Sequence, residues 1–493
     1  MGWNIGNTLG AVERFGARLG ERIATSTPVL AVAPKTADRI DHYLQGITAP
    51  TFPRSLELAR PTRLQPTPAA LGAASLTAPG AIASYGIQVT GDGEARLDLT
   101  ATAPGADWGK KGAESAVLGV YVDGKYQQDL VVWGGAQATR YALALGKLAP
   151  GAHTITLRNM HEKAPKGAQG VEVAGASVAV ETYETREDRW AAEQAPILIG
   201  RHGSLENTHT DLPLAMYHDV GKQPDGTTKI SYGYVFSNED SGDGAQPSVE
   251  QARWGRLTDL ETVYNVTLDA NGKVLERSFE GAGHKWAPFA GQFDGAHPII
   301  RTATNNNNVT DRGGGLLRFQ FPTDHRMGDF AKEDLMRQNP VFFATEGKEL
   351  QREGKIGAIT TPEDTLAGKL KAMLGTMGLA KKYRMADPRS YVYVQLKAQD
   401  AATDPIVVRA ILKDGTYADA DLGQRAVAIA RDGWSQTAIK LPAGVKPDDI
   451  ARVEYLSHGT GRVTRTGHVY MLDGAYQPVE LSRPVAGFET ANP

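Results

Sequence analysis

The chain of 493 residues is too long for one hydrophobic core, since cores stop growing near about 250 to 300 residues and longer chains divide into domains. Its 53 lysines and arginines are balanced by 56 aspartates and glutamates, so no basic surface is expected and nucleic acid is not an expected partner. The absence of cysteine excludes disulfides and thiolate sites, so any metal ligand must be histidine, carboxylate, amide or backbone oxygen.

Residues 1–82 are expected to form an N-terminal helix and a linker. Apolar residues from Ile5 to Ile23 recur at helical spacing, which predicts an amphipathic helix over residues 3–24. Such a helix either docks on its own protein or makes peripheral contact with a membrane surface. The rest of this segment is rich in proline and alanine, as linkers are.

No apolar run is long enough to predict a transmembrane helix, which needs about 18 consecutive apolar residues. The N-terminus also lacks the basic head and apolar stretch of a standard secretory signal. A secreted or cell-surface location is nevertheless favoured over a cytoplasmic one.

Residues 83–186 alternate apolar and polar residues in short runs separated by Asp-Gly and Pro-Gly turns, which predicts a β-sandwich. The run Val122-Asp-Gly-Lys, followed by Leu148-Ala-Pro-Gly-Ala-His-Thr-Ile-Thr-Leu, is similar to jelly-roll accessory modules of carbohydrate-active proteins.

Three further segments complete the expected organisation. Residues 187–350 are predicted to form a central β domain with polar, histidine-rich loops. Thr361 as N-cap and Pro362 in the first turn indicate a helix within a connector over residues 351–388. Strand patterns return over residues 389–493, which predicts a C-terminal β-sandwich. The predicted fold is therefore mainly β, with three sandwich-type domains, an N-terminal amphipathic helix and one helical connector.

Histidines concentrate in the central segment. Six of the 11 fall there: His202, His209, His218, His284, His297 and His325. None of them has a standard zinc spacing, so the sequence does not assign them to one metal. His297 is a candidate ligand-binding residue and His284 a candidate catalytic one, while a satisfied hydrogen-bonding role is the alternative for each.

Asp259 and Glu261 lie two residues apart at the start of a predicted strand. Residues i and i+2 of a strand point to the same face, so the two carboxylates should converge. Converging carboxylates repel each other unless a cation, an arginine or a shared proton compensates them. The pair therefore predicts a calcium or magnesium site or an acid–base pair, and a solvated sheet face is the remaining alternative.

A family resemblance covers residues 230–310. The order Ile230-Ser-Tyr-Gly-Tyr-Val-Phe-Ser-Asn-Glu-Asp, Gly255-Arg-Leu-Thr-Asp-Leu-Glu, Gly283-His-Lys-Trp and His297-Pro-Ile-Ile-Arg-Thr resembles the Vps62-like family and the necrosis- and ethylene-inducing peptide-like proteins. The resemblance implies a central β-sandwich with a divalent cation near Asp259 and Glu261, and extends to His284 and Asp240. In the necrosis-inducing relatives such a site recognises sphingolipid head groups. Leu260 stands where the motif has an aromatic residue, and Arg256 and Thr258 stand where it has histidines.

The run from Asn305 to Asn308 is followed by glycines and predicts a polar loop. Asparagine and glycine tolerate left-handed backbone, and their amides suit a loop that binds a sugar or completes a calcium shell, whereas the alternative is a plain turn. Asn305 and Asn306 are the candidate ligand-binding residues. Trp254 and Trp286 lie nearby in the sequence and could stack on sugar rings, although aromatic residues more often belong to a core.

Three hypotheses follow. The favoured one is a binding or effector protein that recognises a glycan or glycolipid head group, with calcium or magnesium held by Asp240, Asp259 and Glu261. The second is a carbohydrate-active hydrolase or lyase that uses Asp259 and Glu261 as acid and base with assistance from His284 or His297. The third is a structural surface protein without a catalytic site. No nucleotide or redox cofactor is expected from any of them.

Overall fold

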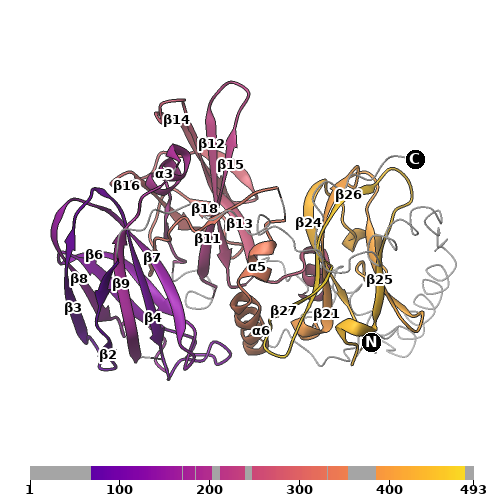
Figure 1. Ribbon diagram of the computed structural model, residues 1–493, viewed down its shortest axis with the longest axis horizontal. Coiled ribbons are helices and arrows are strands. Elements are labelled where there is room, and N and C mark those ends of the chain that lie inside the picture. Colours follow the sequence, from indigo (N-terminus) through magenta and orange to yellow (C-terminus); the bar gives the residue numbers. More distant parts are fainter. Residues whose placement is uncertain are drawn as a thin grey trace, which may run out of the picture.

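The computed structural model describes residues 68–168, 170–183, 185–202, 211–238, 247–329, 331–353, 385–442 and 444–482. Within these ranges the chain is mostly β-structure, arranged as an N-terminal sandwich, a central domain and a C-terminal sandwich (Figure 1). The predicted N-terminal helix over residues 3–24 and the predicted helix of the connector, from Thr361, lie outside the described residues.

The first sandwich is built from nine strands: β1 Ala69–Leu71, β2 Ala74–Leu76, β3 Ile82–Val89, β4 Gly93–Thr102, β5 Ala116–Val122, β6 Lys125–Val132, β7 Thr139–Leu148, β8 Gly151–Asn159 and β9 Val171–Val180. One sheet has the order β1-β9-β4-β7 with β2 also on β9, and the other has the order β3-β8-β5-β6. Since β1 and β2 pair with β9, the linker predicted up to residue 82 includes two strands of this sandwich.

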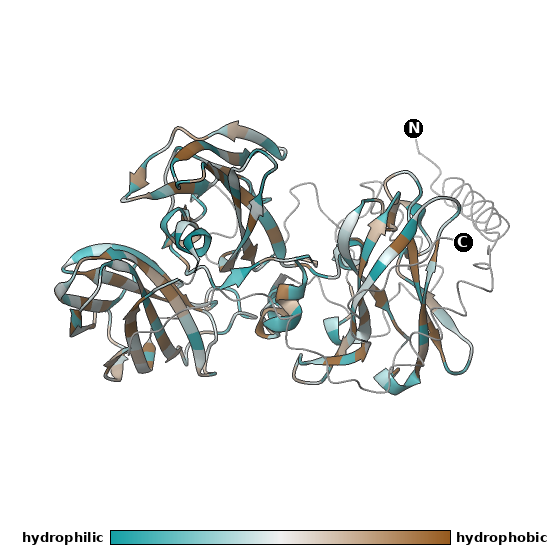
Figure 2. Cartoon of the chain, turned by 45° about the horizontal axis from the view of Figure 1, so that its top comes forward, coloured by the Kyte–Doolittle hydropathy of each residue, from teal (hydrophilic) through white to brown (hydrophobic). Residues whose placement is uncertain are grey.

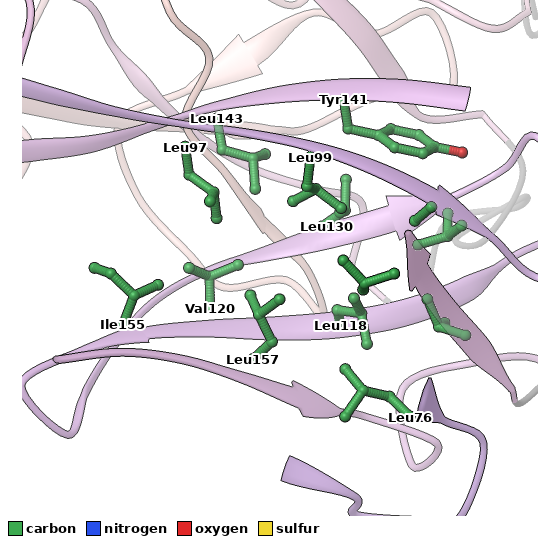
Figure 3. Close-up of a cluster of buried hydrophobic side chains, with 14 of the residues drawn as sticks. Leu76, Leu97, Leu99, Leu118, Val120, Leu130, Tyr141, Leu143, Ile155 and Leu157 are labelled. Carbon is green, nitrogen blue, oxygen red and sulfur yellow. The ribbon is translucent and has the colours of Figure 1, made fainter. Parts of the chain in front are cut away.

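Alternation of polar and apolar residues explains why these strands form two layers (Figure 2). In β4, for example, buried and half-buried residues alternate along most of the strand. Leu97 and Leu99 from β4 meet Leu118 and Val120 from β5 between the sheets (Figure 3). The hairpin between β5 and β6 turns through Asp123 and Gly124, whose φ angles of 51° and 78° are left-handed, as the Asp-Gly pair favours.

The central domain contains two sheets and a short helix, α3 Arg186–Glu193. The larger sheet has the order β15-β14-β13-β12-β11-β20, and the smaller has the order β16-β17-β10-β19 with β18 on β17. Their strands are β10 Ile197–Ile199, β11 Pro213–Lys222, β12 Thr228–Phe236, β13 Asp259–Leu268, β14 Val274–Gly281, β15 Lys285–Pro288, β16 Phe293–Asp294, β17 His297–Thr302, β18 Val309–Thr310, β19 Arg318–Phe319 and β20 His325–Arg326. Tyrosines and phenylalanines fill the space between the two sheets.

The C-terminal sandwich packs the sheet β24-β21-β26-β27 against the sheet β23-β22-β25. Its strands are β21 Tyr391–Gln399, β22 Val407–Leu412, β23 Tyr417–Asp419, β24 Gly433–Lys440, β25 Ile450–Leu456, β26 Arg462–Leu472 and β27 Pro478–Ser482. Helices α5 Asp334–Gln338 and α6 Val341–Glu353 lie between the C-terminal sandwich and the rest of the molecule (Figure 1), and helix α4 Pro247–Trp254 packs on β24.

Helix α6 connects all three parts of the molecule. Phe343 packs on Tyr393 of the C-terminal sandwich, with ring centroids 5.2 Å apart, and belongs to a core that also includes Leu260 of β13. On the opposite side, the Trp108 indole of the first sandwich donates to Glu349 Oε2 at 3.0 Å. The domains therefore share packed and hydrogen-bonded boundaries.

The prediction of a mainly β, multidomain fold with β-sandwich-like domains is confirmed. Among the described residues, no helix is both long enough and apolar enough to span a bilayer.

Gly233 of β12 offers a test of the central sheet, because the register of β12 against β13 shifts between Tyr232 and Gly233. A Cβ atom on Gly233 would lie 2.6 Å from the carbonyl oxygen of Glu261 and also against the Tyr217 ring. We expect Gly233→Ala to cost about 1 to 3 kcal/mol through overpacking and to lower the thermal midpoint of the central domain by several degrees. Gly221→Ala in β11 is the control, since its Cβ would make only ordinary contacts. Equal midpoints for the two variants would contradict this account.

Candidate functional site

The first strand residues of β13 carry the two carboxylates identified in the sequence. Asp259 lies opposite Phe236 and Glu261 lies opposite Tyr234 in the antiparallel pair with β12. Directly opposite residues share a face of the sheet, and both aromatic residues point into the core between the two central sheets. Asp259 and Glu261 therefore both face the smaller sheet and its loops.

Asp259 is only 1% exposed. Its Oδ2 accepts a hydrogen bond from Asn307 Nδ2 at 3.1 Å, and its Oδ1 has no hydrogen-bond partner within the described ranges. Burial holds the pKa of Asp259 well above its usual range, and the charge of Glu261 raises it further, while Arg256 and the Asn307 hydrogen bond oppose the shift. Asp259 is thus a carboxyl group enclosed by protein.

Asn307 links Asp259 to a second buried acid. Its Nδ2 also donates to Asp211 Oδ2 at 3.2 Å, and its Oδ1 accepts from Arg201 Nη2 at 3.0 Å. Arg201 in turn forms an ion pair with Asp211 and donates to the carbonyl oxygen of Asn305. Asn307 has a left-handed φ of 52°, a conformation that asparagine tolerates better than most residues. This network holds the loop of residues 303–308 against the central sheet.

Glu261 belongs to a separate cluster at the surface. Glu261, Glu280 and His284 each place one potential ligand atom within 4.8 Å of the others. His284 Nδ1 lies 3.2 Å from Glu280 Oε1 and 3.9 Å from Glu261 Oε2. The two glutamates are 16% and 12% exposed, and the imidazole is 52% exposed. The cluster combines partly buried carboxylates with a ring that solvent can reach.

The asparagine loop approaches this cluster from the other sheet. The Nδ2 of Asn306 lies 3.4 Å from His284 Nε2, and the Nδ2 of Asn308 lies 3.5 Å from His284 Nδ1. Trp286 extends the same hairpin, where it pairs directly opposite Glu280, and its side chain is 44% exposed. Since opposite residues share a face, the side chains of Trp286 and Glu280 project from the same side of the hairpin.

The remaining candidates lie elsewhere or are not described. Trp254 packs on the guanidinium of Arg431, 3.8 Å from its ring centre, at the boundary with the C-terminal sandwich. His297 is 5% exposed, and its imidazole lies 3.3 Å from Glu94 of the first sandwich and 2.9 Å from the carbonyl oxygen of Ala195. Asp240, the third candidate metal ligand, lies outside the described residues.

The histidines of the central segment are not gathered at one place. His218 is fully buried and stacks on Tyr232, with ring centroids 6.3 Å apart, while His325 lies on the edge strand β20. His202 is exposed directly after Arg201, and His209 lies outside the described residues. Of the described histidines, His284 alone is part of the acidic cluster.

Sequence reasoning did not single out Glu280, Asn307 and Asn308 as site residues. Glu280 had a recognisable signal, since it precedes His284 by four residues across a Gly-Ala-Gly turn. Such a turn brings the two side chains of a hairpin together. Nothing in the run of four asparagines indicated which one would be buried, because that depends on the partner residues Asp211 and Arg201.

This geometry does not suit Asp259 and Glu261 as a catalytic acid–base pair. A catalytic carboxyl group must come within hydrogen-bond reach of its substrate, whereas Asp259 is enclosed and bonded to Asn307. Asp259 instead accepts a hydrogen bond from Asn307 and so helps to hold the asparagine loop that faces His284.

Comparison with known proteins gives little further information. No protein-family model and no curated protein matches the chain, so the Vps62-like resemblance stays a prediction. A family 36 carbohydrate-binding module of a multidomain xylanase from the hindgut metagenome of Trinervitermes trinervoides is 16% identical, with a TM-score of 0.18, over 24% of this chain and 94% of that one. A family 36 module in complex with calcium and xylotriose is 15% identical, with a TM-score of 0.18, over 24% of this chain and 98% of that one.

A third solved structure, a family 6 module from Cellvibrio mixtus lichenase 5A in complex with cellotriose, is 11% identical, with a TM-score of 0.16, over 25% of this chain and 89% of that one. Similarities this low do not identify a ligand for this protein.

A group of buried charges lies on the other side of β13. Lys332 donates to the carbonyl oxygen of Leu260, and Arg256 Nε lies 3.7 Å from Glu333 Oε1. Glu346 of α6 accepts from the backbone N–H of Thr258 at 3.2 Å. Burial raises the pKa of Glu346 to about 7, although the backbone hydrogen bonds and the charge of Arg256 oppose the shift.

The raised pKa of Glu346 predicts a loss of stability in mildly alkaline solution. A carboxyl group whose pKa is higher in the folded than in the unfolded state stabilises the fold fully below about pH 4.5, and this contribution disappears as the pH rises through about 7. Glu346→Gln keeps a hydrogen-bond acceptor for Thr258 but does not titrate. Relative to wild type, we expect this variant to gain about 3 kcal/mol between pH 4.5 and pH 8.5, measured by urea unfolding.

The exposed Glu276→Gln variant controls for removal of a negative charge. A stability difference between Glu346→Gln and wild type that stays constant across this pH range would show that Glu346 is charged in the folded protein.

Proposed function

We propose that this protein recognises a glycan through a divalent cation held by Glu261, Glu280 and His284. The observation that carries the proposal is the convergence of these three side chains, which come from β13, β14 and the turn after β14, within 4.8 Å. Two carboxylates so close together repel each other, and a bound cation would relieve that repulsion.

The donor set allows several cations. Carboxylate and amide oxygens favour calcium and magnesium, whereas the imidazole of His284 favours zinc and also suits other transition ions. Three protein ligands leave coordination positions for groups from outside the protein. Neighbouring hydroxyl groups of a sugar are suitable oxygen donors for those positions.

Trp286 supports a sugar as the outside ligand. This residue is 44% exposed and pairs directly opposite Glu280 on the β14–β15 hairpin. A sugar ring offers hydroxyl groups at its edge and C–H groups on its face, so it can contact a cation and an aromatic ring together. The amides of Asn306 and Asn308, which lie beside His284, add hydrogen-bonding groups at the same place.

Cation binding is the first test of this proposal. We expect calcium, magnesium, manganese or zinc to raise the thermal midpoint of the wild-type protein, because a ligand that binds only the folded state stabilises it by mass action. The effect should be lost in Glu261→Gln and Glu280→Gln. Glu276→Gln, on the exposed part of the same strand β14, should respond as wild type does. No shift with any of the four ions in the wild-type protein would overturn the cation site.

Glycan binding is the second test. On an array of neutral and acidic glycans, we expect one set of glycans whose binding EDTA abolishes and the preferred cation restores. Trp286→Ala should weaken this binding by roughly tenfold while leaving the cation-induced thermal shift intact, since stacking on an aromatic ring contributes about 1 kcal/mol or more. Binding that is unchanged by EDTA and by Trp286→Ala would place recognition away from this cluster.

A further inference from the structure

A cleft of about 700 Å³ lies between the first sandwich and the central domain. Its walls come from the outer face of the sheet β1-β9-β4-β7, from the start of β11 with the segment after β19, and from the beginning of α6. None of the cation-cluster residues Glu261, Glu280 and His284 lines it. The volume is in the range of pockets that enclose small ligands, and boundaries between domains are common places for them.

The walls of the cleft are fixed by contacts between the domains. Arg96 of β4 donates to Asp324 Oδ1 at 2.6 Å, and the backbone N–H of Ala144 donates to the carbonyl oxygen of Gln320 at 3.0 Å. Helix α6 is held on the far side, where Arg352 donates to the carbonyl oxygen of Trp108 at 3.0 Å. A cleft with walls tied in this way is formed before its ligand arrives, which lowers the cost of binding.

Aromatic and polar groups share the lining. Trp133 and Phe321 are partly buried aromatic residues of the lining. Trp133 packs edge to face on Tyr141, whose ring belongs to the core of the first sandwich, with ring centroids 5.6 Å apart. Trp133 is only partly buried. It packs against the core of the first sandwich, the core of the central domain and the core around helix α6. Near these rings Arg140 donates to Asp98 at 3.2 Å, and its side chain is 73% exposed.

The charge of the lining limits the chemistry of the ligand. Two arginines, Arg96 and Arg140, face the four carboxylates of Asp98, Asp129, Glu181 and Asp324. Lys163 Nζ lies 2.8 Å from Asp129 Oδ2 and offsets the charge of this carboxylate. The two arginines and this lysine still do not outnumber the four carboxylates. Phosphorylated, sulfated and other anionic ligands would therefore be repelled. Paired arginine and aspartate side chains remain good donors and acceptors for uncharged hydroxyl groups.

We propose that this cleft is a second ligand site, which binds a short neutral oligosaccharide without a cation. Trp133 and Phe321 would contact the C–H faces of the sugars, and Arg140 with Asp98 and Asp324 would hydrogen-bond their hydroxyl groups. The class of ligand rests on the proposed glycan-recognising function, whereas the site itself rests on the cleft and its lining.

The tryptophans allow both sites to be followed in one experiment. The full-length protein is labelled with 5-fluorotryptophan, and the ¹⁹F signals of Trp133 and Trp286 are assigned from Trp133→Phe and Trp286→Phe. Maltotriose, cellotriose and triacetylchitotriose are titrated as neutral probes, and sulfated maltotriose is titrated as an anionic one. We expect at least one neutral trisaccharide, and not the sulfated one, to shift the Trp133 signal saturably in the presence of EDTA.

Arg140→Ala should weaken that titration by about fivefold to tenfold, because it removes a hydrogen-bond donor to the ligand. Lys147→Ala removes another exposed cation from the same strand β7, where it pairs with Asp92 at 2.9 Å, and should leave the titration unchanged. Glu261→Gln should also leave the Trp133 titration unchanged.

In a parallel titration with the preferred cation and without EDTA, a trisaccharide that shifts the Trp286 signal alone would overturn the cleft as a site and leave the proposed cation-dependent function standing. A Trp133 titration that EDTA or Glu261→Gln abolishes would likewise overturn an independent second site. If no neutral probe shifts either signal, the cleft proposal fails together with its assumed ligand class.

Discussion

One buried amide fixes the asparagine loop that lies beside the candidate cation cluster. Asn307 donates to two carboxylates, Asp211 and Asp259, while it accepts from Arg201. Two enclosed acids beside each other would be strongly unfavourable alone, and the arginine and the amide make their burial tolerable. Because these partners fix residue 307, its neighbours Asn306 and Asn308 are held next to His284. The buried residues Asp211, Asp259 and Asn307 therefore have a structural role. The more exposed cluster of Glu261, Glu280 and His284 is the part that a ligand can reach.

This division separates two carboxylates that look equivalent in the sequence. Asp259 is enclosed, and its pKa is raised by burial, whereas Glu261 two residues later reaches the surface beside Glu280. Both side chains project from the same side of the sheet. Asp259 lies inside the core, whereas Glu261 lies at its edge, and this difference decides what each carboxylate contacts. An enclosed carboxyl anchors the loop, and a partly exposed one can share a cation with groups from outside.

Charged side chains also meet across the boundary between the first sandwich and the central domain. His297 meets Glu94 across one boundary, and Arg96 meets Asp324 across the same one. The cleft next to these contacts lies where the outer face of one sheet of the first sandwich meets the start of β11, the segment after β19 and the beginning of α6. Neither the cleft nor the charge balance of its lining is a property of either domain alone.

The sequence by itself determined the class of the fold and the direction of the Asp259 and Glu261 side chains, because both follow from the two-residue periodicity of a strand, which is local. It also pointed to the asparagine run, since amide-rich loops have a recognisable composition. Only the tertiary structure decided that His297 and Trp254 join domain boundaries, that Glu280 completes the cluster and that Asn307 is the buried member of its run. Those outcomes depend on residues far away in the chain, such as Glu94, Arg431 and Asp211, and the packing of separate sheets brings them together.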